Sequence, residues 1–282
     1  MSSRPTRLVV NADDLGLHPS LDAGILRAHR EGIVTSATLL AMGPTAAEAA
    51  DRARAQGLAV GLHLALSTRL TPAAPAQAVS TVAPGGRLRG SWADFARDWL
   101  MGKVRREEVA LELDAQLRRA RELGVAVDHL DGHQHLHVLP GIRPLVEALA
   151  ARERLPLRWP DALPRVKWLR TPGPALKTTL LTVLARTAPR APQGVRRVSA
   201  GGVFEAGRLD EAALLAALDA LPSGDFELGC HPGEGAPHVP EDPAWHYGWQ
   251  AELAALTSPR VRARLDERGI QLHSYGTLAS AT

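Results

Sequence analysis

The chain has 282 residues and a net charge of +3, and hydrophobic residues make up 45% of it. This composition is that of a water-soluble chain with a buried core, which excludes a disordered or collagen-like protein. The length fits two ordinary domains or one α/β barrel, because such barrels commonly span about 200–250 residues. The single cysteine excludes an intrachain disulfide, so we expect a reducing, cytoplasmic location.

The sequence shows neither a secretory signal nor a membrane span. Residues 1–6 are polar and lead into a short apolar run at 8–10, which is below the roughly 7–15 apolar residues of a secretory signal. No run approaches the about 18 apolar residues that a membrane helix needs. Basic residues are interspersed with acidic ones, as is typical of solvated helix faces. We therefore expect no membrane span and no nucleic-acid partner.

Short apolar runs alternate with helical patterns along the chain, which predicts βαβ units and a parallel sheet. The predicted strands lie at 8–12, 33–42, 58–66, 125–130, 155–159, 226–230 and 270–275. The predicted helices lie at about 20–32, 45–56, 109–124, 140–152, 209–221 and 259–267. Residues at about 67–90 are rich in Pro, Ala, Gly and Ser and predict a long surface loop. The segment at about 160–205 gives no clear pattern.

Polar clusters follow several predicted strands, at the point where each strand ends. Because the carboxyl ends of parallel strands meet at one rim, we expect these clusters to lie together. Taken alone, a pair of aspartates is more often a turn or a helix cap, and a lone histidine is more often structural. The clusters are Asn11-Ala12-Asp13-Asp14, Gly61-Leu62-His63, Asp131-Gly132-His133-Gln134-His135-Leu136-His137 and Cys230-His231-Pro232-Gly233.

The histidine-rich cluster indicates a metal site. His133, His135 and His137 alternate with period two, so they would share one face if the segment were extended. Imidazole and carboxylate groups are the usual protein ligands of Zn²⁺ and related ions, and catalytic sites combine three of them with an open position. Cys230 lies inside an apolar run, so we interpret its thiol as buried packing rather than as a ligand or nucleophile.

These ordered motifs, together with Gly32-Ile33-Val34-Thr35-Ser36, resemble those of the YdjC-like carbohydrate deacetylase family. The resemblance implies a deformed (β/α) barrel of the glycoside hydrolase/deacetylase type that binds one divalent metal ion. It implies that Asp14, His63 and His133 are the metal ligands, that Asp13 is the catalytic base and that His231 is the general acid. These residues span positions 13 to 231, so we expect residues 1–282 to form a single domain.

The resemblance also implies a function: hydrolysis that removes acetyl groups from N-acetylated amino sugars or oligosaccharides and releases acetate and a free amine. Two histidines and one aspartate fit Zn²⁺, while the family allows Mg²⁺ equally. We expect His135 and His137 to face the substrate or to support the ligands. Trp245 and Tyr247 are the expected substrate wall, since sugar sites stack aromatic rings against the substrate.

Alternative functions stay open at this point. A metal-dependent phosphoesterase or amidohydrolase would also use a His-x-His pair, although there the pair typically ends the first strand, where this chain has Asp13-Asp14. A deacetylase of lipid-linked, hopanoid-pathway sugars would carry the same motifs. An Arg-rich protein that binds polyanions without catalysis would instead show salt-sensitive DNA binding. A homo-oligomer is also compatible with the sequence.

Overall fold

The structure is a computed structural model that describes residues 5–162, 172–235, 239 and 247–280. Its centre is a parallel sheet in the order β2-β3-β4-β5-β6-β7-β1-β8, and an additional pairing of β1 with β2 closes seven of these strands into a barrel. The strands are β1 (Thr6–Leu15), β2 (Ser36–Leu39), β3 (Ala59–Leu64), β4 (Leu130–Gly132), β5 (Leu157–Trp159), β6 (Arg197–Gly201), β7 (Gly224–Cys230) and β8 (Gln271–Leu272).

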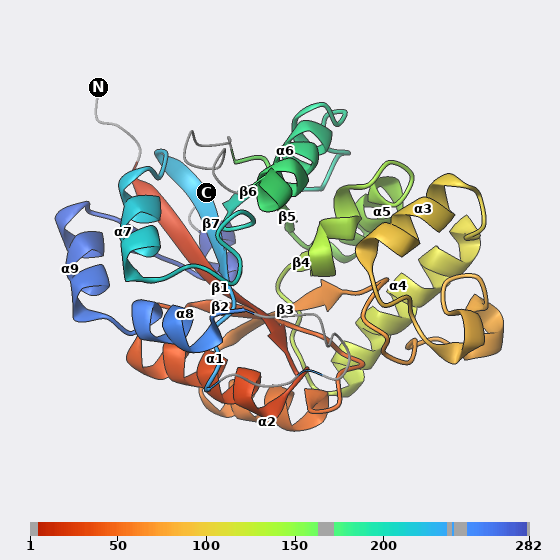
Figure 1. The fold of residues 1–282 in the computed structure, drawn as a ribbon, viewed down its shortest axis with the longest axis horizontal. Coiled ribbons are helices and arrows are strands. Elements are labelled where there is room, and N and C mark those ends of the chain that lie inside the picture. The colour runs from red at the N-terminus through yellow and green to blue at the C-terminus, as the bar shows by residue number, and fades with distance from the viewer. Residues whose placement is uncertain (1–4, 163–171, 236–238, 240–246, 281–282) are drawn as a thin grey trace.

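Helices surround this barrel (Figure 1). The α-helices are α1 (Pro19–Glu31), α2 (Ala46–Ala55), α3 (Trp92–Leu100), α4 (Arg106–Glu122), α5 (Arg143–Glu153), α6 (Pro172–Arg186), α7 (Glu211–Asp219), α8 (Trp249–Leu256), α9 (Pro259–Glu267) and α10 (Tyr275–Ser280). Short 3₁₀ turns are η1 (Ala76–Val79), η2 (Pro84–Gly86) and η3 (His133–Val138). The predicted (β/α) barrel is confirmed, and its deformation is visible in β4 and β5, which share a single register pair. Among the described helices, none has the length and apolar character required to cross a bilayer.

The alternation of side chains in β1 separates two environments. Leu8, Val10 and Ala12 face outward and pack with the helices in one apolar cluster. The intervening Asn11 faces into the barrel, where its register partners are Ser36 of β2 and Gly229 of β7. The barrel interior is therefore polar near the carboxyl ends of its strands, where charged side chains can be accommodated.

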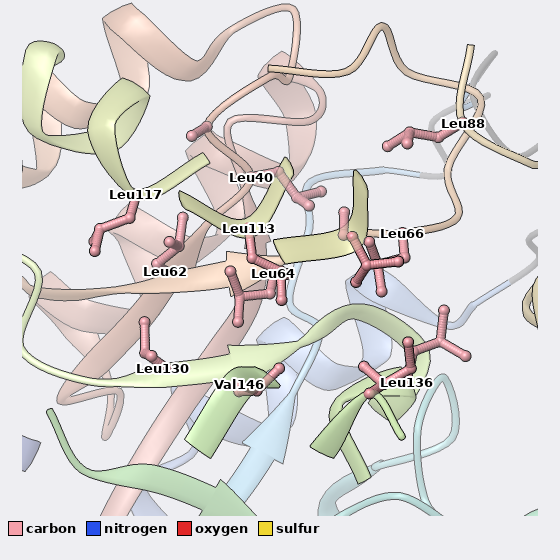
Figure 2. Packing of buried hydrophobic residues seen from close by; sticks show 14 of the residues in the cluster. Leu40, Leu62, Leu64, Leu66, Leu88, Leu113, Leu117, Leu130, Leu136 and Val146 are labelled. Atoms are coloured by element: carbon pink, nitrogen blue, oxygen red, sulfur yellow. The ribbon is translucent and has the colours of Figure 1, made fainter. Parts of the chain in front are cut away.

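A second apolar cluster packs β3, β4 and η3 against α4. Figure 2 shows Leu62 and Leu64 of β3 packed with Leu113 and Leu117 of α4. The segment at 67–90 joins this cluster through buried apolar side chains that include Leu70, Val79, Val82 and Leu88. It also donates backbone N–H groups of Ala73 and Ala74 to the carboxylate of Glu112, both at 2.9 Å. The segment is thus irregular in backbone but packed into the core.

Several predicted boundaries differ from the observed ones. The predicted strand at 125–130 begins only at Leu130, and the predicted strand at 270–275 is reduced to Gln271–Leu272. Tyr275 instead begins α10 and places its side chain, 1% exposed, against Val9 inside the barrel. This interior anchor explains the early end of β8. The pattern also missed α3, α6, α8, α10 and β6.

Candidate metal and catalytic site

Two consecutive carboxylates enter one cavity at the end of β1. Successive side chains of a regular strand point to opposite faces, so Asp13 and Asp14 would ordinarily separate. The register between β1 and β2 shifts after Ala12, and Asp14 has a φ of 68° in the left-handed region. Such irregularities cost energy and occur preferentially at functional sites. Here the irregularity brings both carboxylates to the same cavity wall.

Three buried side chains each bring one potential ligand atom to the same point. The Nδ1 of His133 lies 3.0 Å from the Oδ1 of Asp14 and 3.3 Å from the Nε2 of His63. The third distance, from His63 Nε2 to Asp14 Oδ1, is 3.5 Å. Atoms bonded to a divalent ion at about 2.0–2.1 Å lie roughly 2.8–3.0 Å apart at octahedral angles and roughly 3.3–3.4 Å apart at tetrahedral angles. The donor set and its spacing therefore fit a divalent ion.

Asp131 of β4 orients His63. Its Oδ1 lies 2.7 Å from the Nδ1 of His63, and its Oδ2 accepts a hydrogen bond from Thr38 at 3.1 Å. A carboxylate that engages one ring nitrogen leaves the other nitrogen available to a metal ion. Burial alone would lower the pKa of His63, but the charges of Asp131 and Asp14 outweigh it and raise that pKa to about 9. A divalent ion bound at the Nε2 of His63 would then have to displace a proton from this imidazole.

Arg158 of β5 holds Asp13 in place. Its guanidinium donates to both carboxylate oxygens of Asp13 at 2.6 Å, and it also reaches Asp131 at 2.8 Å and Glu227 at 2.6 Å. A planar guanidinium suits such a bidentate contact. Burial would raise the pKa of Asp13, but the charge and hydrogen bonds of Arg158 hold it well below its usual range. Asp13 is therefore ionised and fixed in orientation.

His231 directly follows β7 and approaches the same carboxylates. Its Nε2 lies 3.8 Å from the Oδ2 of Asp13 and 4.0 Å from the Oδ2 of Asp14. The ring of Tyr247 meets the His231 ring edge-on at a centroid distance of 5.0 Å. The buried carboxylate of Glu252 in α8 accepts the backbone N–H of His231 at 2.6 Å. Helix α8 thus fixes the turn that carries the imidazole.

The histidine-rich segment after β4 is not extended. It forms η3, in which Gln134 and His135 have φ values of 53° and 61°. The expectation that three alternate histidines share one face is wrong, because these left-handed residues break the alternation. His135 lines the cavity, whereas His137 is buried and its Nε2 donates to the carbonyl of Arg158 at 3.1 Å. Gly132 leaves room for the His137 ring, since a Cβ there would lie 2.6 Å from its Nδ1.

The cavity wall contains one residue that the sequence predicted there and one that it did not. Tyr247, expected to contact substrate, lines the cavity, and Trp245 lies outside the described residues. Lys177 of α6 also lines the cavity and was not expected there. Burial lowers the pKa of Lys177. Burial, with the nearby charges of Arg158 and Lys177, holds the pKa of His135 well below its usual range, so that this imidazole is neutral.

With this geometry described, comparison with known proteins decides the family, because the model of YdjC-like proteins matches residues 7–267. The chain belongs to the YdjC-like protein family. A carbohydrate deacetylase of Mus musculus is 38% identical over 97% of this chain and 95% of its own length. A chitooligosaccharide deacetylase of Enterobacter sp. (strain 638) is 32% identical over 95% of this chain and 97% of its own.

A solved structure shares the fold of this YdjC-like protein. The crystal structure of a protein from Enterococcus faecalis V583, proposed to cleave cellobiose phosphate, superposes with a TM-score of 0.77 at 28% identity. The match covers 97% of this chain and 99% of that one. The barrel is therefore shared over the whole length of both chains.

The free cysteine is buried at the end of β7 and donates to the carbonyl of Asn11 at 3.3 Å, which confirms its interpretation as packing.

Sequence reasoning missed four residues that shape this YdjC-like site. Arg158 stands between two apolar residues in a short strand, and a charge in that position indicates a buried partner. Asp131 belongs to the same motif as His133, but its position in that motif does not indicate that it would orient His63. Lys177 and Glu252 reach the site only through the packing of α6 and α8, for which the sequence carries no comparable signal.

Proposed function

We propose that this YdjC-like protein is a metal-dependent hydrolase that removes acetyl groups from N-acetylated amino sugars or oligosaccharides. One observation carries the proposal: the Asp13–Arg158 pair and His231 converge on the cluster of Asp14, His63 and His133. A base, an acid and a cation site thus share one cavity. These are the groups that metal-dependent amide hydrolysis requires. The relatives named carbohydrate deacetylase and chitooligosaccharide deacetylase support a sugar as the substrate.

The cluster of Asp14, His63 and His133 would hold one divalent ion, Mg²⁺ or Zn²⁺. Its two imidazoles favour Zn²⁺, because Mg²⁺ prefers oxygen ligands. When bound, such an ion polarises the amide carbonyl and acidifies water. Asp131 supports the site by holding the His63 ring through Nδ1, so that Nε2 points at the shared centre.

Asp13 takes the proton of the attacking water. Its carboxylate is available at neutral pH because Arg158 holds its pKa below the usual range. The same contact makes Asp13 a weak base, so proton transfer to it would depend on the acidification of water that a bound ion supplies. The fixed geometry compensates, since both oxygens are held at 2.6 Å from guanidinium nitrogens and need no reorganisation during the reaction.

His231 donates the proton to the departing nitrogen. An amine anion is a very poor leaving group, so breakage of the C–N bond requires a donor at that atom. Together these steps add one water across the amide and give acetate and a free amine. The cavity has a volume of about 100 Å³, which suits an acetamido group rather than a whole sugar. The sugar would then meet the cavity walls that carry Tyr247, His135 and Lys177.

The test is acetate release from N,N′-diacetylchitobiose by the purified protein. Treatment with a chelator should abolish the activity, and Zn²⁺ or Mg²⁺ should restore it. Asp13→Asn should lower kcat by roughly 10²–10⁴-fold, while Asp51→Asn, an exposed aspartate on α2, should match wild type. Activity that is indifferent to chelation and to Asp13→Asn would refute the proposal. Hydrolysis of phenyl phosphate without acetate release would favour the phosphoesterase instead.

A further inference from the structure

A second cavity, of about 420 Å³, lies against the outer face of β6 and β7. Figure 1 shows these two strands between α7 and α6, and both helices contribute to the cavity wall. Its volume falls within the roughly 300–1,000 Å³ of small-molecule sites. It is about four times as large as the catalytic cavity of about 100 Å³.

The sequence creates this space by placing small residues where a barrel normally carries large ones. Helix α6 lines it with Thr178 and Thr182, one turn apart, and with Arg186 at its end; α7 lines it with Ala217, and Ala220 follows the last residue of α7. The exposed residues Ala220 and Pro222 on its wall show that the cavity opens to solvent, so a ligand can enter it. A cavity of this size, lined from both helices by small side chains, points to a bound group.

The second cavity adjoins the catalytic one. Gly201, Gly202 and Val203, at the end of β6, line both cavities. Gly202 has a φ of 96°, and a Cβ there would lie 2.3 Å from the carbonyl oxygen of Gly229 in β7. The wall is closed where Gly202 packs on β7, and only backbone separates the two cavities there. A substrate whose amide occupies the catalytic cavity would reach the second cavity by extending a substituent over the Gly202–Val203 backbone, around the end of β6.

The chemistry of the wall selects the kind of substituent. Most of the wall is apolar and includes Phe204, Leu221, Phe226 and Leu228. Several of its polar groups are already satisfied: Ser199 donates to Asp161, Thr182 donates to the carbonyl of Ala162 at 3.0 Å, and Arg186 donates to the carbonyl of Asp161 at 3.1 Å.

Glu205 also lies on this wall, and its carboxylate makes no hydrogen bond or ion pair with the described residues, although its backbone carbonyl accepts from the N–H of Arg208 at 2.7 Å. Its chain neighbours Val203 and Ala206 both line the catalytic cavity, so a hydroxyl of the sugar at this junction would satisfy the carboxylate. A whole sugar in the second cavity would leave most of its hydroxyl groups unpaired, which is costly, whereas an alkyl chain would gain from burial.

We propose that this cavity is an alkyl-chain subsite of the same catalytic centre. The inference rests on the proposed function and adds that its preferred substrates are amino sugars that carry an alkyl chain. The chain could be the N-acyl group itself or a substituent at the glycosidic position. In the first case water breaks the same C–N bond and the chain leaves as a carboxylate; in the second the chain stays on the sugar and acetate leaves.

Binding of octyl β-glucoside and methyl β-glucoside, measured by calorimetry below the micellar concentration, tests the subsite without turnover, because neither compound has an amide. The octyl compound should bind wild type at least roughly tenfold more tightly. Ala217→Phe should remove this gain by filling the cavity. The matched control is Ala216→Phe on the exposed side of α7, which should retain the gain. Thermal melting reports whether each variant folds. If Ala217→Phe does not fold, Ala217→Leu replaces it. Leu fills less of the cavity and should remove part of the octyl gain.

Turnover of N-octanoylglucosamine and of octyl N-acetylglucosaminide then shows whether the chain is the N-acyl group or the glycosidic substituent. The compound that carries the chain at the preferred position should have the lower KM. Ala217→Phe should cancel that preference while acetate release from N,N′-diacetylchitobiose stays within about twofold of wild type. Equal binding of octyl and methyl glucosides, or an octyl gain that survives Ala217→Phe, would overturn the subsite. Absence of deacetylation together with an octyl gain sensitive to Ala217→Phe would reject the proposed function and leave the subsite standing.

Discussion

The hydroxyl of Tyr275 donates a hydrogen bond to the carboxylate of Glu227 inside the barrel. The other oxygen of that carboxylate accepts from the Nε of Arg158 at 2.6 Å, and Arg158 in turn holds Asp13. A continuous chain of hydrogen bonds therefore links the carboxy-terminal helix α10 to the proposed catalytic base. Both Tyr275 and Glu227 are almost completely shielded from solvent, so neither can exchange this contact for water.

Tyr275→Phe tests this link with the loss of one oxygen atom. The variant keeps the ring that stacks on His129 at a centroid distance of 3.8 Å but leaves the Oε2 of Glu227 without the Tyr275 donor, while Arg158 still donates to the Oε1. We expect the free energy of unfolding to fall by about 1–3 kcal/mol, because a buried acceptor loses its partner. kcat for acetate release should fall several-fold, while KM stays close to the wild-type value. Denaturant unfolding and steady-state kinetics provide the two measurements. An unchanged kcat would show that the link is structural only.

Arg158→Met should be far more damaging. It leaves the carboxylates of Asp13, Asp131 and Glu227 buried without their shared cation, which typically costs about 3–5 kcal/mol. Because Arg158 lowers the pKa of Asp13, its removal should raise that pKa. Activity requires ionised Asp13, so the acidic limb of the kcat/KM profile should move to higher pH.

Arg152→Met is the matched control for Arg158→Met, since the Arg152 side chain is 56% exposed on the surface of α5. It should leave both the stability and the pH profile essentially unchanged. Arg158→Lys keeps a charge but lacks the bidentate fork, so it should recover stability more than activity. An acidic limb that does not move in Arg158→Met would argue against Asp13 as the base.

Parts of this arrangement were predictable from local sequence. The alternation of Leu8, Val10 and Ala12 with Asn11 and Asp13 predicts which side chains of β1 face inward. The parallel strand pattern then places residues at the ends of β1, β3, β4 and β7 on a common rim. The order of strands and helices along the chain is thus sufficient to locate the site.

The remaining features depend on contacts between distant segments. Asp14 enters the cavity through a left-handed conformation that no local propensity demands of an aspartate. The η3 turn likewise places Gln134 and His135 in left-handed conformations, which the period-two spacing of the histidines does not reveal. Tyr275 leaves its predicted strand because the barrel interior offers it Glu227 as an acceptor. Tertiary packing overrides local preference at each of these positions.

Asp131→Asn tests the proposed ion site through its pH dependence. In wild type the charge of Asp131, together with that of Asp14, raises the pKa of His63 to about 9, against the effect of burial. An ion must displace the resulting proton, so Zn²⁺ affinity should rise about tenfold per pH unit between pH 7 and pH 9. The variant should release fewer protons on binding and reach its plateau at lower pH.

Loss of the carboxylate that orients His63 should also weaken Zn²⁺ binding by roughly 10–100-fold in the Asp131→Asn variant. Competition with a chromophoric chelator from pH 6 to pH 9 gives the affinity, and weakly buffered titrations give the proton count. Asp51→Asn, on the exposed face of α2, serves as the control for the removal of one negative charge. Equal proton release in wild type and Asp131→Asn would exclude the proposed coupling.

Asp22 supports the site from outside and makes folding stability depend on pH. Its Oδ1 accepts the backbone N–H of Gly16 at 2.6 Å, and its Oδ2 accepts from Thr45 at 2.5 Å, which joins the loop after β1 to the start of α2. Burial raises the pKa of Asp22 to about 6, despite these hydrogen bonds. The folded protein therefore holds this proton more tightly than the unfolded chain, in which an aspartate titrates near about 3.9.

A raised carboxyl pKa stabilises the folded state at low pH, and this contribution is lost as pH rises through about 6. Asp22→Asn has no such titration, while its amide oxygen can still accept from Gly16. The free energy of unfolding of wild type, taken relative to Asp22→Asn at each pH, should therefore fall by about 2 kcal/mol between pH 4 and pH 8. Referencing to the variant cancels the other carboxylates of the site, which titrate in both proteins. Denaturant unfolding across this range measures the difference, and a gap that stays constant with pH would show that Asp22 does not titrate in the folded protein.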